Sequence, residues 1–321
     1  MKRAAKNALR CYLSILLCAG IAAQSSADEA TTKELLVRMA SALRSLSYEG
    51  VLVYAHEDRL ETLRIVHRVE DGGVHELLES LNGPVRTVTR ERDQVTCRLT
   101  GDRPFSVNSP SLGADLLVSK PIDPQALSPH YVVHPLGDAR VVGRQTEVVG
   151  IIPRDAFRYG YRFYIDTESG LPLKSDLMGT EAKPIEQIVF ASLDLDPIQP
   201  VESLLATRTE PSREQALSPA ELGPWRFERL PAGFELVMVD RSADTAGQPM
   251  GHFVLSDGLA SVSIYIETGD ENGLDGGSRI GAVHAAGGKI AGYQITVVGE
   301  VPESTVQAVL DGLTFSAEDG G

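Results

Sequence analysis

Residues 60–69 read LETLRIVHRV, a stretch in which two kinds of side chain alternate. In an extended strand successive side chains point to opposite faces, so Leu63, Ile65 and His67 share one face and Arg64 and Arg68 share the other. The stretch therefore predicts a half-buried β-strand and not a site where the histidine and the arginines converge. We expect the histidine on the apolar side and the arginines in solvent.

The same period of two continues on both sides of this stretch. Eight further strands are predicted, at residues 48–56, 74–81, 85–92, 93–99, 144–152, 159–166, 171–178 and 185–195. Ahead of them, Thr31 and Glu34 form a capping box, and the apolar residues that follow are three to four apart, which predicts an amphipathic helix. Nine strands in a mostly antiparallel meander with one early helix predict a strongly curved sheet wrapped on that helix.

The alternation fails between residues 104 and 135, where six of the 18 prolines fall. An irregular segment of this length is usually a lid, a docking loop or an insertion. We interpret it as a lid with one short helix around residues 114–118.

A polar, proline-bearing stretch at residues 201–223 predicts a linker, and short strands with glycine turns resume after it. Pro302 then begins a helix in which Val306, Val309, Leu310 and Leu313 share a face. We therefore expect an N-terminal domain at residues 28–200 and a smaller α+β domain at residues 224–321.

The first 27 residues have the layout of a secretory signal peptide. A basic beginning precedes an apolar run at residues 11–23, which is short for a membrane span, and small residues follow it. Leu17 before Cys18 argues against a lipoprotein. Removal of four positive charges with this leader would lower the formal charge from −14 to −18, and a chain this acidic is not expected to bind nucleic acid.

The sequence gives no catalytic or metal-binding signature. DGGSRIG at residues 275–281 resembles a nucleophile elbow, but Ile280 stands where the second glycine is needed. Cys97, alone after removal of the leader, is expected to be a buried, inert thiol. His130 and His134 flank apolar residues between two prolines, and on an extended chain they would lie roughly 13 Å apart, too far to share a metal ion. We expect no enzyme activity, no cofactor and no metal.

The basic residues from 59 to 103 are all arginine, eight in number. A planar guanidinium suits carboxylate and phosphate oxygens. Arg86 and Arg90 share a strand face, so they are candidates for an anion site. The alternative is a solvated strand face with cross-strand ion pairs.

Several stretches taken together resemble the MucB/RseB family of periplasmic sigma-E regulators. They run in the family's order along almost the whole chain: YEGVLVY, LETLRIVHRV, SLNGPVRTVTR, GYRFYIDTESGLPLKSDL, HFVLSDGLASVSIYIE and ITVVGEVP. The resemblance implies an N-terminal half-open antiparallel β-barrel, like that of lipoprotein carriers, around an apolar cavity, with a smaller C-terminal sheet and helix. It also implies a non-enzymatic periplasmic protein that binds the periplasmic region of a membrane-anchored anti-sigma factor and shields it from site-1 proteolysis. Lipid or lipopolysaccharide would relieve the shielding.

Alternation places candidate cavity-lining residues on the strands: Val51, Val53, Leu63, Ile65 and Val88. His67 would line or border the cavity, unless it is a core histidine bonded to a backbone carbonyl. Arg86 and Arg90 would meet the phosphates of an acyl lipid.

We expect partner contacts in SDGLASVSIYIE, at Ser256, Asp257, Ser261, Ser263 and Tyr265. The protein could also form a homo-oligomer. The alternative functions are a lipid or lipoprotein carrier without a signalling role and, more distantly, a periplasmic hydrolase.

Overall fold

The computed structural model describes residues 30–70, 73–82, 86–91, 94–99, 105–108, 127, 129–181, 183–196, 222–243, 249–268 and 273–316. The predicted leader, the predicted short helix at residues 114–118 and nearly all of the predicted linker lie outside these residues. For β4, β5 and β6 the description covers the course of the backbone.

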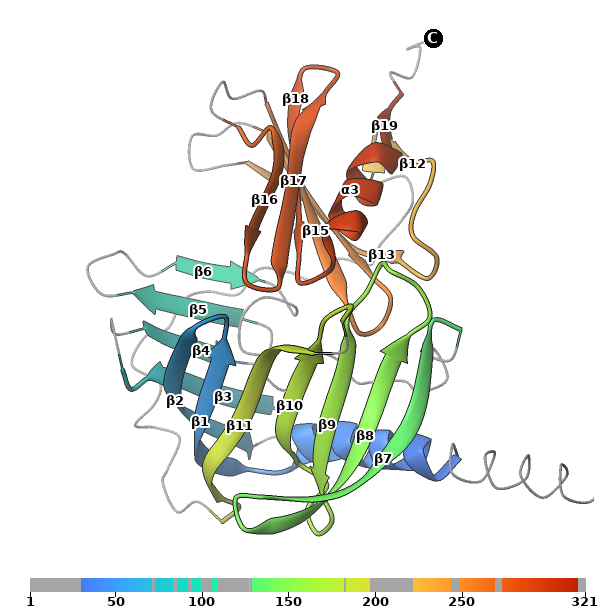
Figure 1. Cartoon of the computed structure of the whole chain (residues 1–321). Coiled ribbons are helices and arrows are strands. Elements are labelled where there is room, and N and C mark those ends of the chain that lie inside the picture. The colour runs from blue at the N-terminus through green and yellow to red at the C-terminus, as the bar shows by residue number, and fades with distance from the viewer. Residues whose placement is uncertain are drawn as a thin grey trace, which may run out of the picture.

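In the described part of the chain, one open antiparallel sheet of eleven strands occupies the N-terminal half (Figure 1). Its spatial order is β6-β5-β4-β3-β2-β1-β11-β10-β9-β8-β7, so β1 and β11 join two meanders edge to edge. The strands are β1 (Tyr48–His56), β2 (Arg59–Glu70), β3 (Gly73–Ser80), β4 (Arg86–Glu91), β5 (Gln94–Leu99), β6 (Phe105–Asn108), β7 (Tyr131–Val141), β8 (Arg144–Pro153), β9 (Gly160–Asp166), β10 (Pro172–Met178) and β11 (Pro184–Asp194).

A helix over residues 30–45 lies against one face of this sheet, which we call the inner face (Figure 1). Its residues Leu36 and Met39 pack with Phe163 and other side chains of β7 to β9, and Ala42 packs with Leu52 and the side chains of β2 and β11. Full burial of each large apolar side chain stabilises the fold by about 1.5–3 kcal/mol. The helix is therefore held mainly by its apolar stripe, as its spacing predicts.

All nine strands predicted for this half are present. The structure adds β6, which lies inside the segment predicted to be an irregular lid, and β7, which begins inside that segment and extends beyond it. Pro104 precedes β6, and Pro135 lies at a bulge in β7, which is an edge strand. Proline removes a ladder donor and is tolerated at such positions, so it marks an edge here and not the absence of a strand.

The C-terminal part forms a second antiparallel sheet. Among the described residues its order is β13-β14-β15-β18-β17-β16, and a helix and a two-stranded ribbon pack beside it. The elements are β12 (Trp225–Phe227), β13 (Glu235–Ala243), β14 (Pro249–Ser256), β15 (Ser261–Thr268), β16 (Gly276–Ile280), β17 (Val283–Ile290), β18 (Tyr293–Gly299), α3 (Glu303–Gly312) and β19 (Leu313–Phe315).

Helix α3 begins directly after Pro302 and buries Val306 and Val309 against Val262, Ile264 and the neighbouring strands, as the sequence predicts. Leu313, predicted on the same helix face, lies in β19 instead. The sequence did not predict β16, because the Gly-rich stretch GGSRI is exposed throughout and shows no alternation. The predicted α+β class with two antiparallel sheets and few helices is confirmed. No helix within the described ranges is long and apolar enough to cross a membrane.

Strand β2 has the predicted phase but not the predicted exposure. Arg64 and Arg68 both contact Glu49 on β1, away from the face that carries His67, so the two faces are assigned correctly. The expectation that both arginines lie in solvent is wrong for Arg68, which is 3% exposed and donates to the backbone carbonyls of Tyr48 and His67.

Candidate functional site

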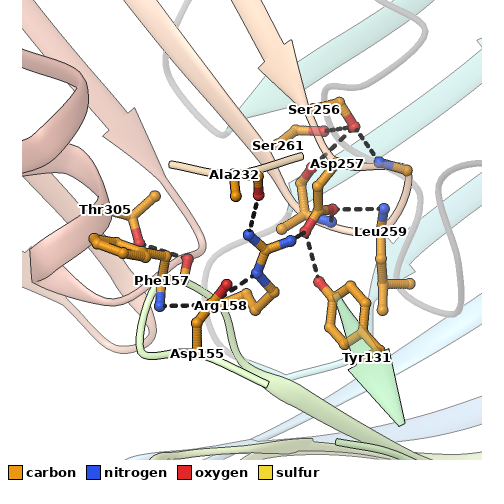
Figure 2. A network of polar contacts seen from close by, with 12 residues as sticks. Tyr131, Asp155, Phe157, Arg158, Ala232, Ser256, Asp257, Leu259, Ser261 and Thr305 are labelled. Carbon is orange, nitrogen blue, oxygen red and sulfur yellow. Dashed lines mark hydrogen bonds and ion pairs between the residues drawn. The ribbon is translucent and has the colours of Figure 1, made fainter. Parts of the chain in front are cut away.

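The large and the small sheet meet at a polar contact centred on Arg158, which lies in the β8–β9 connection (Figure 2). The Arg158 side chain is 0% exposed. Its Nη1 donates to Oδ2 of Asp257 at 2.7 Å, and its Nε donates to Asp155 at 3.0 Å. Its Nη2 donates to the backbone carbonyl of Ala232. One arginine of the N-terminal part is thus bound to two segments of the C-terminal part.

Asp257 receives hydrogen bonds from both sides of this contact. Its Oδ2 also accepts from the hydroxyl of Tyr131 at 2.7 Å, while its Oδ1 accepts from the backbone amides of Leu259 and Ala260. Burial, together with the Asp257 carboxylate, raises the pKa of Tyr131, so this hydroxyl remains a donor. The carboxylate therefore has partners on both oxygens.

Aromatic rings and a close backbone approach complete the contact. The guanidinium of Arg158 lies 5.5 Å from the ring centroid of Tyr131 and 5.1 Å from that of Phe234. Gly233 has a φ of +85°, and a Cβ there would overlap the ring of His130. We call this set, Tyr131, Asp155, Arg158, Ala232, Phe234 and Asp257, the Arg158 contact.

The first turn of α3 binds the same β8–β9 connection. Oγ1 of Thr305 donates to the carbonyl of Phe157 at 2.6 Å (Figure 2). Oγ of Ser304 donates to the carbonyl of Ala156 at 2.8 Å. Removing one partner of a buried ion pair typically costs about 3–5 kcal/mol, because the other charge is left uncompensated. Loss of either Arg158 or Asp257 would therefore weaken the link between the two sheets.

A second link joins the tip of the β16–β17 hairpin to the large sheet. Glu186 accepts from the hydroxyl of Tyr54 at 2.6 Å and from the amide of Ala282 at 3.2 Å, and Glu57 accepts from the amide of Gly281 at 3.2 Å. Glu300 lies near Glu186. The residue as a whole is exposed, but the protein around its carboxylate reduces the solvation of that group. This desolvation and the negative charge of Glu186 raise the pKa of Glu300 to about 7.

The inner face of the large sheet carries three of the predicted cavity-lining residues. Leu63 and Ile65 are buried there beside Leu52 and Leu78, and His67 is buried at the same face. The ring of His67 stacks on Tyr48 with centroids 4.7 Å apart, and its Nδ1 lies 3.0 Å from Oε2 of Glu76. His67 thus has a carboxylate partner, in place of the backbone carbonyl considered as an alternative.

The prediction that Val51 and Val53 share this face is wrong. Val51 pairs with Arg64 and Val53 with Thr62, whereas Leu52 pairs with Leu63. Cross-strand partners point to the same face, so both valines point away from the helix. The run VLVY is apolar at every position, so alternation alone does not determine which of its side chains face the helix.

The other predicted lipid-binding residues are located by register only. Val88 lies opposite Leu78, and Arg90 lies opposite Glu76. Arg86 lies opposite Leu99 on β5. Val88 and Arg90 are thus placed in the rows that contain Ile65 and His67, and their roles stay predictions.

The predicted partner-binding residues separate into two groups. Ser256 and Asp257 build the β14–β15 turn and are buried, with Asp257 enclosed in the Arg158 contact. Ser261, Ser263 and Tyr265 are partly exposed on β15, on the face opposite the apolar core, and Tyr265 stacks on His252 at 4.4 Å. Partner binding at these five residues stays a prediction.

Arg158 and Tyr131 are the residues that sequence reasoning missed. Arg158 stands between two aromatic residues at the start of a predicted strand, and its partner Asp257 is 99 residues away. No local spacing signals such a pair. Within the described ranges no three His, Cys, Asp or Glu side chains are grouped as metal ligands.

Comparison with known proteins gives the family. The model of the MucB/RseB N-terminal domain matches residues 31–219, and that of the MucB/RseB C-terminal domain matches residues 219–314. The chain belongs to the MucB/RseB family. It is 32% identical over 308 residues to the sigma factor AlgU regulatory protein MucB of Pseudomonas aeruginosa, covering 92% of this chain and 94% of that protein. It is 27% identical over 288 residues to the sigma-E factor regulatory protein RseB of Escherichia coli, covering 88% and 90%.

Solved structures agree with this assignment. A chain in the complex of Pseudomonas aeruginosa MucA and MucB is similar with a TM-score of 0.69 and 30% identity, over 89% of this chain and 99% of that one. A crystal structure of MucB in complex with periplasmic MucA gives a TM-score of 0.67 and 32% identity, over 88% and 98%. The similarity in both cases extends over both sheets.

Proposed function

We propose that this protein is a periplasmic negative regulator of a sigma-E-type envelope stress response. It binds the periplasmic region of a membrane-anchored anti-sigma factor, shields that region from site-1 proteolysis, and has no enzymatic role. The observation that carries the proposal is the similarity over 89% of the chain to a protein solved as the MucA/MucB complex. The predicted leader supports export to the periplasm. The domains would be residues 28–200 and 224–321, joined by the linker at residues 201–223.

The Arg158 contact suits a role as the element through which two ligands influence each other. Asp257 is enclosed in it, so a partner reaches this residue only when the contact opens. A partner that binds the open arrangement and a lipid that favours the closed one would each weaken binding of the other. Such coupling is reciprocal and requires only that each ligand bind the two arrangements with different affinity.

The inner face of the large sheet is the proposed lipid side of this coupling. Leu63 and Ile65 contribute buried apolar side chains to this face, and Arg86 and Arg90 would meet phosphate oxygens at its border. Ser261, Ser263 and Tyr265 on β15 are the proposed partner side. The two sets of residues lie on different sheets, so a change in one need not disturb the other directly.

The proposal is tested by titrating the purified protein into a fluorescently labelled periplasmic fragment of the organism's anti-sigma factor and following anisotropy. Saturable binding, with the fragment protected from the site-1 protease, is the expected result. Absence of binding while acyl lipids are still taken up would leave a lipid carrier and would contradict a signalling role.

A further inference from the structure

One edge of the large sheet is formed by β7, the last strand in its spatial order (Figure 1). The second half of this strand, residues 137–141, follows the bulge at Pro135, and Gly137, Asp138 and Arg140 are exposed there. An edge strand offers amide and carbonyl groups to another strand. Pro135 has no amide to donate and the bulge bends the chain, so the residues after it are the part of β7 best suited to pairing.

The hairpin turn decides which backbone groups of this segment point outward. β7 and β8 are joined by two residues, 142–143, both with positive φ, so the residues that flank this turn form a hydrogen-bonded pair. Hydrogen-bonded and non-hydrogen-bonded pairs alternate along an antiparallel ladder. The backbone groups of Ala139 therefore point toward β8, whereas those of Asp138 and Arg140 point away from the sheet. In agreement, the carbonyl of Gln145, opposite Arg140, is bonded on the side of β9.

The charges on this edge lack partners within the described part of the chain. Asp138 lies directly opposite Glu147 on β8, and two carboxylates in such a pair repel each other. None of Asp138, Arg140 and Glu147 forms an ion pair with another described residue. A cation on the open side of Asp138 would relieve the repulsion, and Arg140, two residues along the same strand, carries such a cation.

A second copy of β7 can supply that cation if the two strands run antiparallel about a two-fold axis. With the axis at Ala139, Asp138 of each copy lies beside Arg140 of the other, and the outward backbone groups of these residues exchange hydrogen bonds. With the axis at Asp138 or at Arg140, two like charges would face each other. The alternation of outward and inward backbone groups excludes an axis between residues. Charge and backbone together therefore select the axis at Ala139.

We propose that the second half of β7 is an interface at which two copies of this chain pair as antiparallel strands, with the two-fold axis at Ala139. The inference goes beyond the proposed function and does not depend on it. Pairing would join the two large sheets and remove an exposed edge from each. Because residues 137–141 form only a short ladder, association should be weak and should depend on protein concentration.

The first test introduces a thiol at the proposed axis. In Ala139→Cys the two introduced side chains would face each other in a non-hydrogen-bonded pair, where Cα atoms are about 4.5 Å apart, a separation that a disulfide can bridge. With oxidised glutathione, this variant should form a covalent dimer about tenfold faster than Gln145→Cys or more. Gln145 is the matched control, because it is exposed on the same hairpin but lies on β8. The unaltered protein reports any contribution of Cys97.

The second test reverses charges and follows self-association by sedimentation velocity at low ionic strength, over a range of protein concentrations. Asp138→Arg places two arginines together in both symmetric contacts, so it should weaken self-association by about tenfold or more. The double variant Asp138→Arg/Arg140→Asp restores opposite charges across the axis and should recover most of the lost affinity. Glu181→Arg, which makes the same change of net charge at an exposed site away from β7, should leave the affinity unchanged.

Three results would overturn the inference. Ala139→Cys could crosslink no faster than Gln145→Cys, or Asp138→Arg could leave self-association unchanged, which would place any dimer at another surface. Protection of the introduced thiol by the anti-sigma fragment, without self-crosslinking, would assign this edge to that partner instead. If a charge variant does not fold, the thiol comparison, which leaves both charges in place, still decides.

Discussion

The guanidinium of Arg158 and the carboxylate of Asp257 form a 2.7 Å hydrogen-bonded ion pair, and neither side chain is exposed. One residue comes from the large sheet and the other from the small one, so the pair exists only while the sheets are in contact. Its desolvated charges make the contact sensitive to loss of either partner.

Arg158→Met is expected to weaken the link between the two sheets by about 3–5 kcal/mol, because it leaves Asp257 buried without its cation. The single tryptophan, Trp225, lies in the core of the small sheet and reports its unfolding by fluorescence. In urea, the tryptophan fluorescence of the variant should report unfolding of the small sheet at a lower urea concentration than the one at which circular dichroism reports unfolding of the large sheet. Lys183→Ala, at an exposed ion pair with Glu181, should change stability by no more than about 0.5 kcal/mol.

The same Arg158→Met variant is expected to bind the anti-sigma fragment more tightly, since the contact that encloses Asp257 is already weakened. Lipid should then reverse the binding less effectively, because it can no longer favour a well-formed closed arrangement. Anisotropy titrations with and without lipid measure both effects. An unchanged affinity together with an unchanged lipid effect would show that the Arg158 contact does not couple the sites.

Gly233→Ala should destabilise the link between the sheets by more than Gly258→Ala does. Both glycines have positive φ, +85° and +95°, so each alanine carries a backbone cost of roughly 1–2 kcal/mol. Only at Gly233 does the added Cβ also overlap the ring of His130, whereas it meets open space at Gly258. The difference between the urea midpoints of the two variants, followed by tryptophan fluorescence, gives the cost of the overlap with His130 alone. Equal shifts would contradict the close approach of these segments.

The stability of the folded protein that depends on Glu300 is expected to decrease as the pH rises. The pKa of Glu300 is raised from 4.5 to about 7 in the folded protein, first by desolvation and then by Glu186. The folded state therefore holds this proton more tightly than the unfolded state. The resulting stabilisation is full below pH 4.5 and is lost progressively up to about pH 7.

The tryptophan transition in urea, measured from about pH 5 to about pH 8, tests this dependence. Its midpoint should fall with pH in the unaltered protein and fall less in Glu300→Gln, which has no proton to lose. Partial exposure of Glu300 limits the size of the effect. Identical pH profiles of the two proteins would refute it.

Leu63→Trp should reduce lipid uptake while leaving binding of the anti-sigma fragment unchanged. The larger ring overfills a buried position on the inner face, with a stability cost of about 1–3 kcal/mol. Leu60→Trp on the same strand is the control, since Leu60 is 68% exposed and lies off that face. Equal loss of lipid and fragment binding in Leu63→Trp would argue against separate sites.

Alternation of side chains was enough to predict β2 and both of its faces, and the three-to-four spacing of apolar residues predicted the helix that covers one of them. It failed at β1, where four consecutive apolar residues left the phase undetermined until the register with β2 was known. It also failed to predict the burial of Arg68, because a strand pattern gives the direction of a side chain but not what covers it. β16 and β19 were too polar or too short to give a periodic signal.

The candidate site was less predictable than the fold for a related reason. Asp257 was singled out within a family-like stretch, but its partners Arg158 and Tyr131 lie 99 and 126 residues away. A buried ion pair between two domains requires no particular spacing in the sequence. Likewise, the contact between Glu76 and His67 could be recognised only when the register placed the two residues opposite each other.

The measurement that tests the account most directly is the affinity for the anti-sigma fragment across a series of lipid concentrations. If lipid and fragment bind two separate, coupled sites, the affinity for the fragment falls as lipid is added and reaches a plateau once the lipid site is saturated. The fragment should then lower the affinity for lipid by the same factor. A fall without a plateau would mean direct competition for one site. An affinity that lipid does not change would contradict the regulatory account altogether.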